Sequence, residues 1–148
     1  MKAAVSDRLV IDASVAISWY FEDERMPYAK SILMKLAEGA EAVVPSLWAL
    51  ETANALLQAE RRGRITAAQA AAFFKQLEDF NLTVDSAPLN RVFEWIFLEA
   101  RRQNLTAYDA AYLELALRRG LPLATLDTGL KKAAKDLGVP IAHSSSGG

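Results

Sequence analysis

Four acidic residues stand where they could hold a metal ion together: Asp12, Glu51, Asp109 and Asp127. Asp12 and Asp127 each follow a short aliphatic run, whereas Glu51 and Asp109 fall in the first turns of predicted helices. If the four carboxylates converge, the site needs a cation, because several clustered anions cannot all stay ionised unaided. A hard divalent metal bound by oxygen ligands is the simplest solution.

Each of these acids also has an ordinary structural explanation. Asp12 and Asp127 are favoured residues for the N-cap of a following helix, and Thr106 with Asp109 has the form of a capping box. Glu51 could be an exposed glutamate of the kind that helices commonly carry. Capping alone explains the set less well, because all four acids are placed at strand ends or helix starts. For each single residue both explanations stay open.

Short apolar runs alternate with longer helical patterns along the chain. The apolar runs predict five short strands, over residues 9–11, 42–44, 82–84, 122–126 and 139–142. Helices are predicted over residues 15–21, 27–38, 47–62, 67–80, 88–103, 107–119 and 129–137. The expected N-caps are Ser46, Thr66 (in a capping box with Gln69) and Thr106. Strands separated by helices predict an α/β domain of three α/β/α layers around a mostly parallel sheet of about five short strands.

In such sheets ligand sites lie at the carboxyl ends of the strands. Strands lead directly into Asp12 and Asp127, and the helices that carry Glu51 and Asp109 begin at the same edge. We therefore expect the four acids to meet at one rim of one sheet.

Polar residues accompany the acids and could hydrogen-bond the carboxylates or metal-bound waters. They are Ser14, Asn54, Thr106 and Thr125. Bonding to the local backbone is the alternative, since serine and threonine do this routinely.

The composition excludes several kinds of chemistry. The 148 residues carry 17 Lys and Arg against 18 Asp and Glu, and a net charge of −1 gives no general attraction for nucleic acid. There is no cysteine, which removes thiol catalysis and suits a reducing cytoplasm. The only histidine, His143, lies near the C-terminal end, which argues against Ser-His catalysis. We expect one domain over residues 1–143, a flexible tail over residues 144–148, and no membrane-spanning segment.

Two other groups of residues invite a functional interpretation. The aromatics Trp19, Tyr20 and Phe21 are consecutive, so one helix cannot bury all three on one face, and at least one is expected to face a partner or a groove. Most of the arginine pairs, such as Arg118 and Arg119, fall in the last turn of a predicted helix. Their favourable interaction with the helix C-terminus explains them without a nucleic-acid ligand.

Four segments resemble, in order, the motifs of the PIN-domain family, and the resemblance runs from about Leu9 to Ile141. The matching segments are Val10–Val15, Glu51–Asn54 (a Glu-x-x-Asn helix), Thr106–Ala110 and Ala124–Asp127. Each motif alone is weakly specific, but four in order at suitable spacing are strongly so.

Within that family a short single-domain chain of this kind resembles the VapC-type toxins of toxin–antitoxin pairs. The resemblance implies an endoribonuclease that depends on Mg²⁺ or Mn²⁺, with Asp12, Glu51, Asp109 and Asp127 as catalytic and metal-binding carboxylates. It also implies an RNA substrate, a homodimer, and a VapB-type antitoxin whose tail lies across the aromatic-lined groove and blocks the acidic pocket.

Two other functions would use the same rim. A non-catalytic module could bind RNA or a protein partner through it without turnover. A phosphoryl-transfer enzyme with an aspartyl nucleophile after its first strand is the other, but its phosphatase form requires a second aspartate two residues later, where this chain has Ser14.

Overall fold

The computed structural model describes residues 7–21 and 27–143. Its centre is a parallel sheet of four strands in the order β3-β2-β1-β4. The strands are β1 (Arg8–Ile11), β2 (Glu41–Val44), β3 (Leu82–Val84) and β4 (Leu123–Ala124). The order places β1 and β2 in the middle, which is where their aliphatic residues, buried on both faces, are expected.

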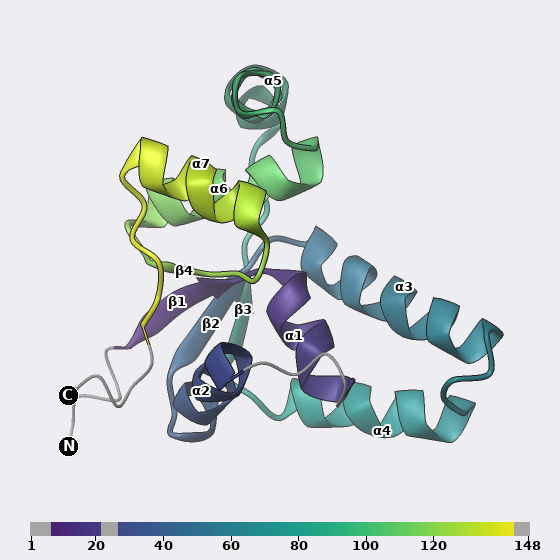
Figure 1. Cartoon of the computed structure of the whole chain (residues 1–148). Helices are drawn as coiled ribbons and strands as arrows, with labels where there is room; N and C mark the ends of the chain where they lie inside the picture. Colours follow the sequence, from purple (N-terminus) through teal and green to yellow (C-terminus); the bar gives the residue numbers. More distant parts are fainter. Residues whose placement is uncertain (1–6, 22–26, 144–148) are drawn as a thin grey trace.

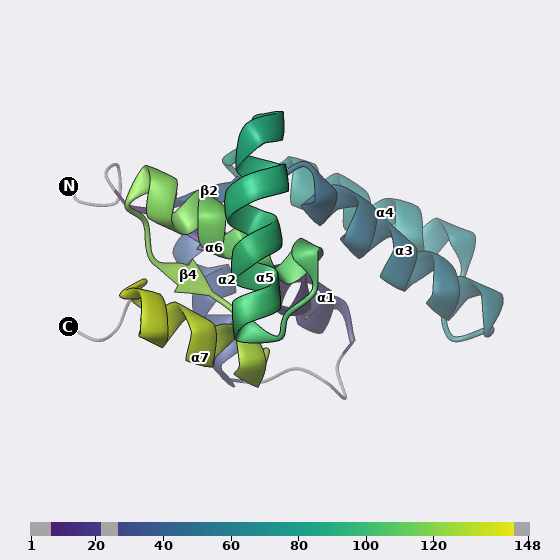
Figure 2. The ribbon, with the colours of Figure 1, turned by 90° about the horizontal axis from the view of Figure 1, so that it is seen from above.

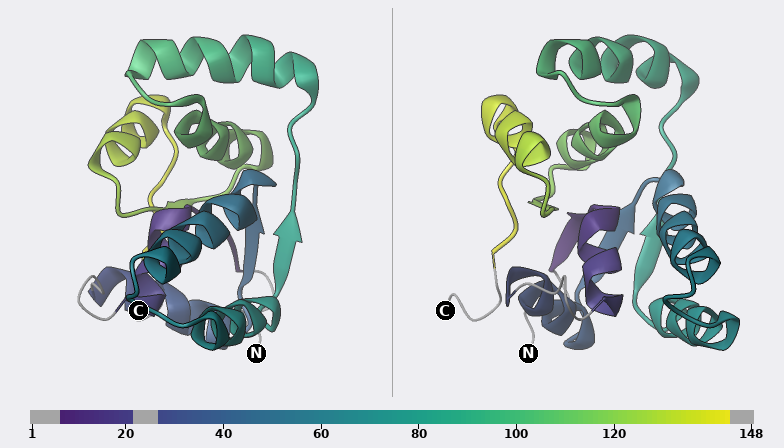
Figure 3. Two further views of the ribbon diagram at one scale, coloured as in Figure 1. Left: turned by 90° about the vertical axis from the view of Figure 1, so that its right-hand side faces the viewer. Right: turned by 45° about the vertical axis from the view of Figure 1, so that its right-hand side comes forward.

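Helices cover both faces of this sheet (Figure 1). Helices α1 (Ala13–Tyr20) and α2 (Pro27–Ala37) lie on one side, and α6 (Ala107–Arg119) and α7 (Thr128–Leu137) lie on the other. Helices α3 (Leu47–Arg61) and α4 (Ala67–Glu78) form an antiparallel pair that extends away from the sheet beside α1. The π-helical η3 (Arg91–Ile96) and α5 (Phe97–Gln103) pack outside α6 (Figures 2 and 3). The predicted three-layer α/β/α fold is confirmed.

The main core lies between the sheet and its helices. Val10 and Ile11 of β1 are fully buried, and Tyr112 and Leu113 of α6 pack into the same cluster. Burying a large aliphatic or aromatic side chain contributes roughly 1.5–3 kcal/mol. This packing fixes the carboxyl end of β1 against α6, which matters for the residues that follow each of them.

The prediction of a fifth strand over residues 139–142 is wrong. Only Ile141 forms a β-bridge, with Leu123. Pro140 has no backbone N–H to donate, so this segment cannot continue a ladder on both sides. The predicted strand over residues 122–126 is likewise shortened to Leu123–Ala124, and Thr125 just beyond its end donates a hydrogen bond to Asp12.

The helix-start predictions have mixed outcomes. The capping box of Thr66 and Gln69 is confirmed, with both reciprocal hydrogen bonds formed, and Thr106 caps α6. Ser46 was expected to cap α3, but it has helical backbone angles and its side chain makes no capping bond. The single helix predicted over residues 88–103 is found as one helical run from residue 89 to residue 103, of which the part Arg91–Ile96 is π-helical.

The three consecutive aromatics are accommodated because α1 ends between them. Trp19 and Phe21 are buried, and Phe21 lies just beyond the helix. Tyr20 is half-buried and packs edge-to-face on Phe21 and Phe73. No helix within residues 7–21 and 27–143 is long and apolar enough to cross a membrane. The tail expected over residues 144–148 lies outside the described residues, as do residues 1–6 and 22–26 of the expected domain.

Candidate functional site

The carboxyl edge of the sheet carries the four predicted acids, called here the acidic rim: Asp12, Glu51, Asp109 and Asp127. They come from the end of β1, from α3, from the first turn of α6 and from the residue after β4. The charge of Asp12 raises the pKa of Asp109, the charges of Asp12 and Asp109 raise the pKa of Glu51, and the charge of Asp127 raises the pKa of Asp12 and of Asp109. The structure therefore brings together all four acids.

Asp12 is the most buried member of the rim, with 5% of its surface exposed. It occupies the N-cap position of α1, but its side chain makes no capping hydrogen bond. Instead its Oδ2 accepts hydrogen bonds from the hydroxyls of Ser14 and Thr125, both at 2.7 Å. The capping explanation for Asp12 is thereby removed, because its carboxylate is oriented by side chains from two different segments.

Both hydroxyls are themselves held in place by the backbone after β4. The N–H of Leu126 donates to Ser14 Oγ at 3.1 Å, and the N–H of Asp127 donates to Thr125 Oγ1 at 3.0 Å. A hydroxyl that accepts from a backbone N–H is left to donate its own proton. Both protons are therefore directed at Asp12, which favours its charged form and joins the ends of β1 and β4 across the rim.

Glu51 has a partner that the sequence prediction missed. The hydroxyl of Tyr112, a fully buried residue of α6, donates to Glu51 Oε1 at 2.7 Å. Tyr112 lies three residues after Asp109, and residues at this spacing share one face of a helix. That spacing alone could have indicated that Tyr112 lies on the same side of α6 as Asp109. Its contact with Glu51 depends on how closely α3 and α6 approach, which cannot be predicted from the sequence.

Asp109 and Asp127 both take part in helix starts. The N–H of Asp109 donates to Thr106 Oγ1 at 3.0 Å. Asp127 is the N-cap of α7, and its Oδ2 accepts from the N–H of Leu130 at 2.7 Å. Gly129 lies against this cap: a Cβ there would stand 3.3 Å from Asp127 Oδ2, which leaves little room for any side chain. Asp127 therefore combines a side-chain cap with membership of the rim, whereas Asp109 takes part in its helix start through its backbone N–H alone.

Among residues 7–21 and 27–143, no basic side chain forms an ion pair with a carboxylate of the acidic rim. Burial raises the pKa of Asp12, and the charge of Asp127 raises it further, against the lowering effect of the two hydroxyls. Burial also raises the pKa of Glu51, and the charges of Asp12 and Asp109 add to this. The pKa of Asp109 is raised by burial and then by Asp12 and Asp127. Each of these carboxylates would be easier to ionise beside a cation.

The donor set of the rim fits a hard divalent cation, since it offers only oxygen ligands and an excess of negative charge. Within the described part of the chain, however, no three acidic or histidine side chains are already grouped as ligands around one point. Glu51 is engaged with Tyr112 and Asp127 with Leu130. Ion binding would therefore involve side-chain movement or ligands that act through water.

The role of Asn54 beside the rim stays a prediction. This residue is exposed on α3 and lines a shallow hollow with Leu50, Leu57 and Phe74. Thr106 is also exposed, but it remains close to the rim through its bond to Asp109. Of the four predicted companions, Ser14 and Thr125 contact a rim carboxylate directly.

Comparison with known proteins agrees with this geometry. A family model described as the PIN domain matches residues 9–136, a range that contains the whole acidic rim. The chain is also 31% identical over 133 residues to Ribonuclease VapC3 of Pyrobaculum aerophilum, a match that covers 90% of this chain and 99% of that protein. The chain belongs to the PIN-domain family.

Solved structures show the same PIN-domain architecture. PAE2754 of Pyrobaculum aerophilum superposes with a TM-score of 0.65 at 25% identity, covering 88% of this chain and 87% of that one. VapC20 of Mycobacterium tuberculosis superposes with a TM-score of 0.64 at 15% identity, covering 84% and 94%. The second likeness concerns the fold alone. The resemblance of the four sequence motifs to the PIN-domain family is confirmed.

Proposed function

We propose that this PIN-domain protein is a metal-dependent endoribonuclease and the toxin of a VapBC-type toxin–antitoxin pair in the cytoplasm. One observation carries the proposal: Asp12 after β1, Glu51 of α3 and Asp109 of α6 raise one another's pKa values, and none of them is paired with a basic residue in the part of the chain that the structure describes. The 31% identity to a protein named Ribonuclease VapC3 supports RNA as the substrate.

The carboxylates of the rim differ in how firmly neighbouring hydrogen bonds orient them, and we assign their metal-binding roles accordingly. Asp12 would hold the ion most firmly, because Ser14 and Thr125 fix its orientation. Glu51 and Asp109 would complete the site, and Tyr112 would orient Glu51 by donating to one of its oxygens. Asp127 lies at the edge and keeps its capping bond to α7. When bound, Mg²⁺ or Mn²⁺ would activate a water molecule and offset charge on the phosphoryl oxygens.

Two surfaces support the proposed partners. A hollow of about 600 Å³ at the C-terminal end of α1, opposite Asp12, is lined by Trp19, Tyr20, Phe73 and Phe80, and it would receive a part of the antitoxin tail that does not itself cover the rim. On η3 and α5, Phe93 and Phe97 are 68% and 52% exposed, an apolar surface that a second copy of the chain would cover in a homodimer.

The test is cleavage of RNA by the purified protein. Cleavage should require Mg²⁺ or Mn²⁺, stop with EDTA, and return when the metal is added in excess. Asp12→Asn should abolish it, whereas Asp136→Asn, an aspartate exposed on α7, should leave it unchanged. If RNA binds but Asp12→Asn and the parent protein both fail to cleave it, the non-catalytic binding module is favoured instead.

The partners are tested separately. Expression of the parent protein should arrest growth, and co-expression of the neighbouring antitoxin gene should relieve it. Light scattering of the purified chain should give twice the mass of 16.2 kDa. A monomer that still cleaves RNA would leave the ribonuclease intact and remove only the homodimer.

A further inference from the structure

A cavity of about 280 Å³ lies at the ends of β2 and β3, on the same edge of the sheet as the acidic rim. Pro45–Leu47 follow β2 and Asp85–Ala87 follow β3, and both segments line the cavity. Because the carboxyl ends of parallel strands share one edge of a sheet, the cavity continues the edge on which Asp12 and Asp127 follow β1 and β4. The metal site proposed above does not include it.

Helices α3 and α6 each contribute to both the cavity and the rim. On α6, Tyr108 lines the cavity and is the neighbour of Asp109 in the chain. On α3, Leu47 lines the cavity, and it lies one turn before Glu51, so the two side chains share a face of the helix. A substrate bound at the rim therefore borders on the cavity.

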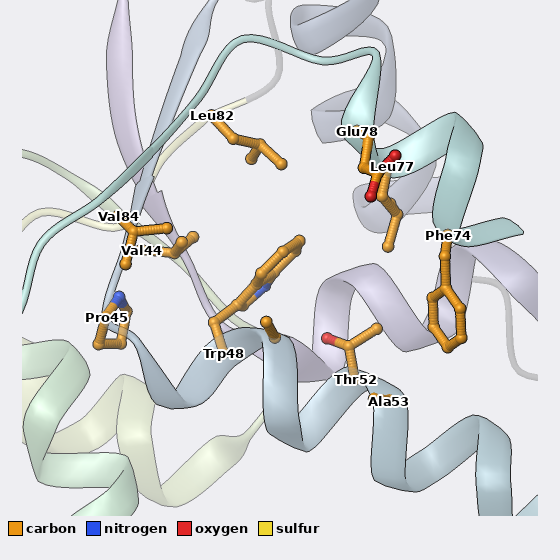
Figure 4. A pocket seen from close by; sticks show the side chains of 11 residues that line it. Val44, Pro45, Trp48, Thr52, Ala53, Phe74, Leu77, Glu78, Leu82 and Val84 are labelled. Carbon is orange, nitrogen blue, oxygen red and sulfur yellow. The ribbon is translucent and has the colours of Figure 1, made fainter.

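Another face of α3 lines a different cavity, of about 430 Å³, between α3, α4 and β3 (Figure 4). Trp48 and Thr52 contribute to its walls, which are almost entirely apolar. The two cavities share Pro45, but the lining of the second includes no residue of α6. Only the first is bounded by the helix that carries Asp109, so the first is the one that can serve a substrate of the rim.

The walls of the cavity at the ends of β2 and β3 combine an exposed aromatic ring with small side chains. Tyr108 exposes 64% of its surface, and Ala87, Ala107 and Ala111 line the same cavity. Bases of single-stranded RNA bind proteins by stacking on aromatic side chains. The volume lies just below the roughly 300–1,000 Å³ of sites for larger ligands, which suits a single planar base.

Two exposed serines add hydrogen-bonding groups to the wall: Ser46 and Ser86. Ser46 directly precedes α3, yet its side chain does not cap that helix, so its hydroxyl is available to a ligand. A hydroxyl can both donate and accept, and the polar edge of a base presents donors and acceptors.

The charged residues of the cavity do not oppose an RNA chain. Asp85 and Glu114 line it, but Glu114 is paired with Arg91 and Arg118, and Asp85 is paired with Arg118 and Arg119. Three arginines against two carboxylates leave one excess positive charge, which favours a polyanion.

We propose that the cavity at the ends of β2 and β3 binds one base of an RNA whose phosphodiester lies at the acidic rim. Tyr108 stacks on the base, and the hydroxyls of Ser46 and Ser86 bond its polar edge. The inference rests on the proposed ribonuclease function and adds to it a site that can select the base beside the cleaved bond.

Paired changes in the protein and in the RNA test this. The probes are random-sequence RNA decamers and decamers of the same backbone that lack every base. Binding is measured by fluorescence anisotropy with Mg²⁺, on the full chain carrying Asp12→Asn so that the RNA is not cut. That protein should prefer the decamers with bases, and adding Tyr108→Ala should lower the preference about 5- to 150-fold, as loss of one stacked base does.

Matched variants separate stacking from other effects. Tyr108→Phe keeps the ring and should keep the preference. Ala111→Leu narrows the cavity and leaves Tyr108 in place, and it should lower the preference as Tyr108→Ala does. Leu117→Ala, an exposed position of α6 outside the cavity, should change nothing. Ser46→Ala should narrow the differences in affinity among decamers of A, C and U.

A preference for bases that Tyr108→Ala leaves intact would overturn the proposal. If the parent protein cleaves RNA in that case, the ribonuclease stands and only the base site falls. If neither probe binds and no RNA is cleaved, the proposed function fails as well. A Tyr108→Ala variant that changes the mass in light scattering but not the preference would show that a second copy of the chain covers the cavity instead.

Discussion

The acidic rim and a second group of charged residues, centred on Glu114, both hold carboxylates that are partly or fully buried, but within residues 7–21 and 27–143 only the second pairs them with arginines. This arginine cluster consists of Asp85, Glu114, Arg91, Arg118 and Arg119. Glu114 is 1% exposed and its Oε2 receives Arg91 at 3.0 Å and Arg118 at 2.8 Å. Arg118 and Arg119 also reach Asp85, at 2.8 and 2.6 Å.

The two groups have opposite electrostatic states. Hydrogen bonds from Arg118 lower the pKa of Asp85, and Asp85 in turn raises the pKa of Arg118. In the rim, burial raises the pKa of Asp12, Glu51 and Asp109. Helix α6 carries members of both groups, with Asp109 in its first turn and Arg118 in its last. Carboxylates that the fold has paired stabilise it, whereas carboxylates that it leaves unpaired remain available to an external cation.

The sharpest test of this contrast is Glu51→Gln, which should have the largest effect. Cleavage of RNA should fall by more than the roughly 10–100-fold that loss of an outer partner of a metal site costs, because a charged oxygen ligand is lost. The free energy of unfolding of the metal-free protein should not fall, since one of several repelling charges is removed. Activity assays and denaturant titrations without metal measure the two effects.

Glu60→Gln is the matched control, because Glu60 is exposed on the same helix. It should change neither cleavage nor stability. If Glu51→Gln destabilised the metal-free protein as a broken ion pair does, the rim and the arginine cluster would not differ in the way described.

The next effect in size concerns the residues that orient Asp12. Thr125→Val removes the hydroxyl that donates to Asp12 Oδ2 but keeps the shape of the side chain. Cleavage should fall about 10–100-fold, mainly through weaker affinity for the metal. A titration of activity against Mg²⁺ distinguishes weakened metal affinity from the loss of a metal ligand. Excess metal should restore much of the rate in Thr125→Val, and none in Asp12→Asn.

Removing a charge from the arginine cluster should lower stability and leave cleavage unchanged, the reverse of the effect expected at the rim. Arg118→Met keeps much of the aliphatic stem but leaves Glu114 and Asp85 with one arginine each. The free energy of unfolding should fall by about 1–3 kcal/mol, the lower part being favoured because Arg118 is partly exposed to solvent. Cleavage per folded molecule should stay unchanged. Arg61→Met, an exposed arginine at the end of α3, is the control for the loss of charge.

The sequence was most informative where structure is local. The capping box of Thr66 with Gln69 and the placement of Asp12 after a buried strand depend on neighbouring residues only, and both are found in the structure. The arginines at the end of α6 were explained by the helix C-terminus, but their specific partner Asp85 follows β3 and lies 33 residues away from Arg118. A pairing of that kind depends on packing between elements.

The same limit explains the misses at the site. Tyr112 looks like an ordinary core aromatic in the sequence, and its bond to Glu51 exists because α6 and α3 meet. Asn54 was predicted to accompany the rim because it follows Glu51 by three residues; it is exposed on α3, and its contact with the carboxylates stays a prediction. The prediction of a fifth strand was wrong at Pro140. An apolar run predicts burial, but proline has no backbone N–H to donate to a neighbouring strand.

The smallest predicted effect is the pH dependence of stability in the metal-free protein. The pKa values of Asp12, Glu51 and Asp109 are raised in the fold, so these groups oppose folding at neutral pH and stop doing so as acid protonates them. The pKa of Asp85 is lowered, so its contribution is present at neutral pH and is lost as pH falls through its folded value. Stability should therefore rise on acidification from neutral pH and fall below the ordinary carboxyl range near pH 4.

The rise in stability on acidification comes from the carboxylates of the acidic rim, and the fall at lower pH comes from the arginine cluster. Asp12→Asn should flatten the rise, Arg118→Met should weaken the fall, and each change should be on the order of 1 kcal/mol or less because most of these groups are only half-buried. Saturating Mg²⁺ should remove the rise by stabilising the charged rim at neutral pH. Denaturant midpoints measured across the pH range, with and without metal, provide the comparison. A rise that persisted in Asp12→Asn, or that Mg²⁺ left unaltered, would mean that the charges of the rim are already balanced within the protein.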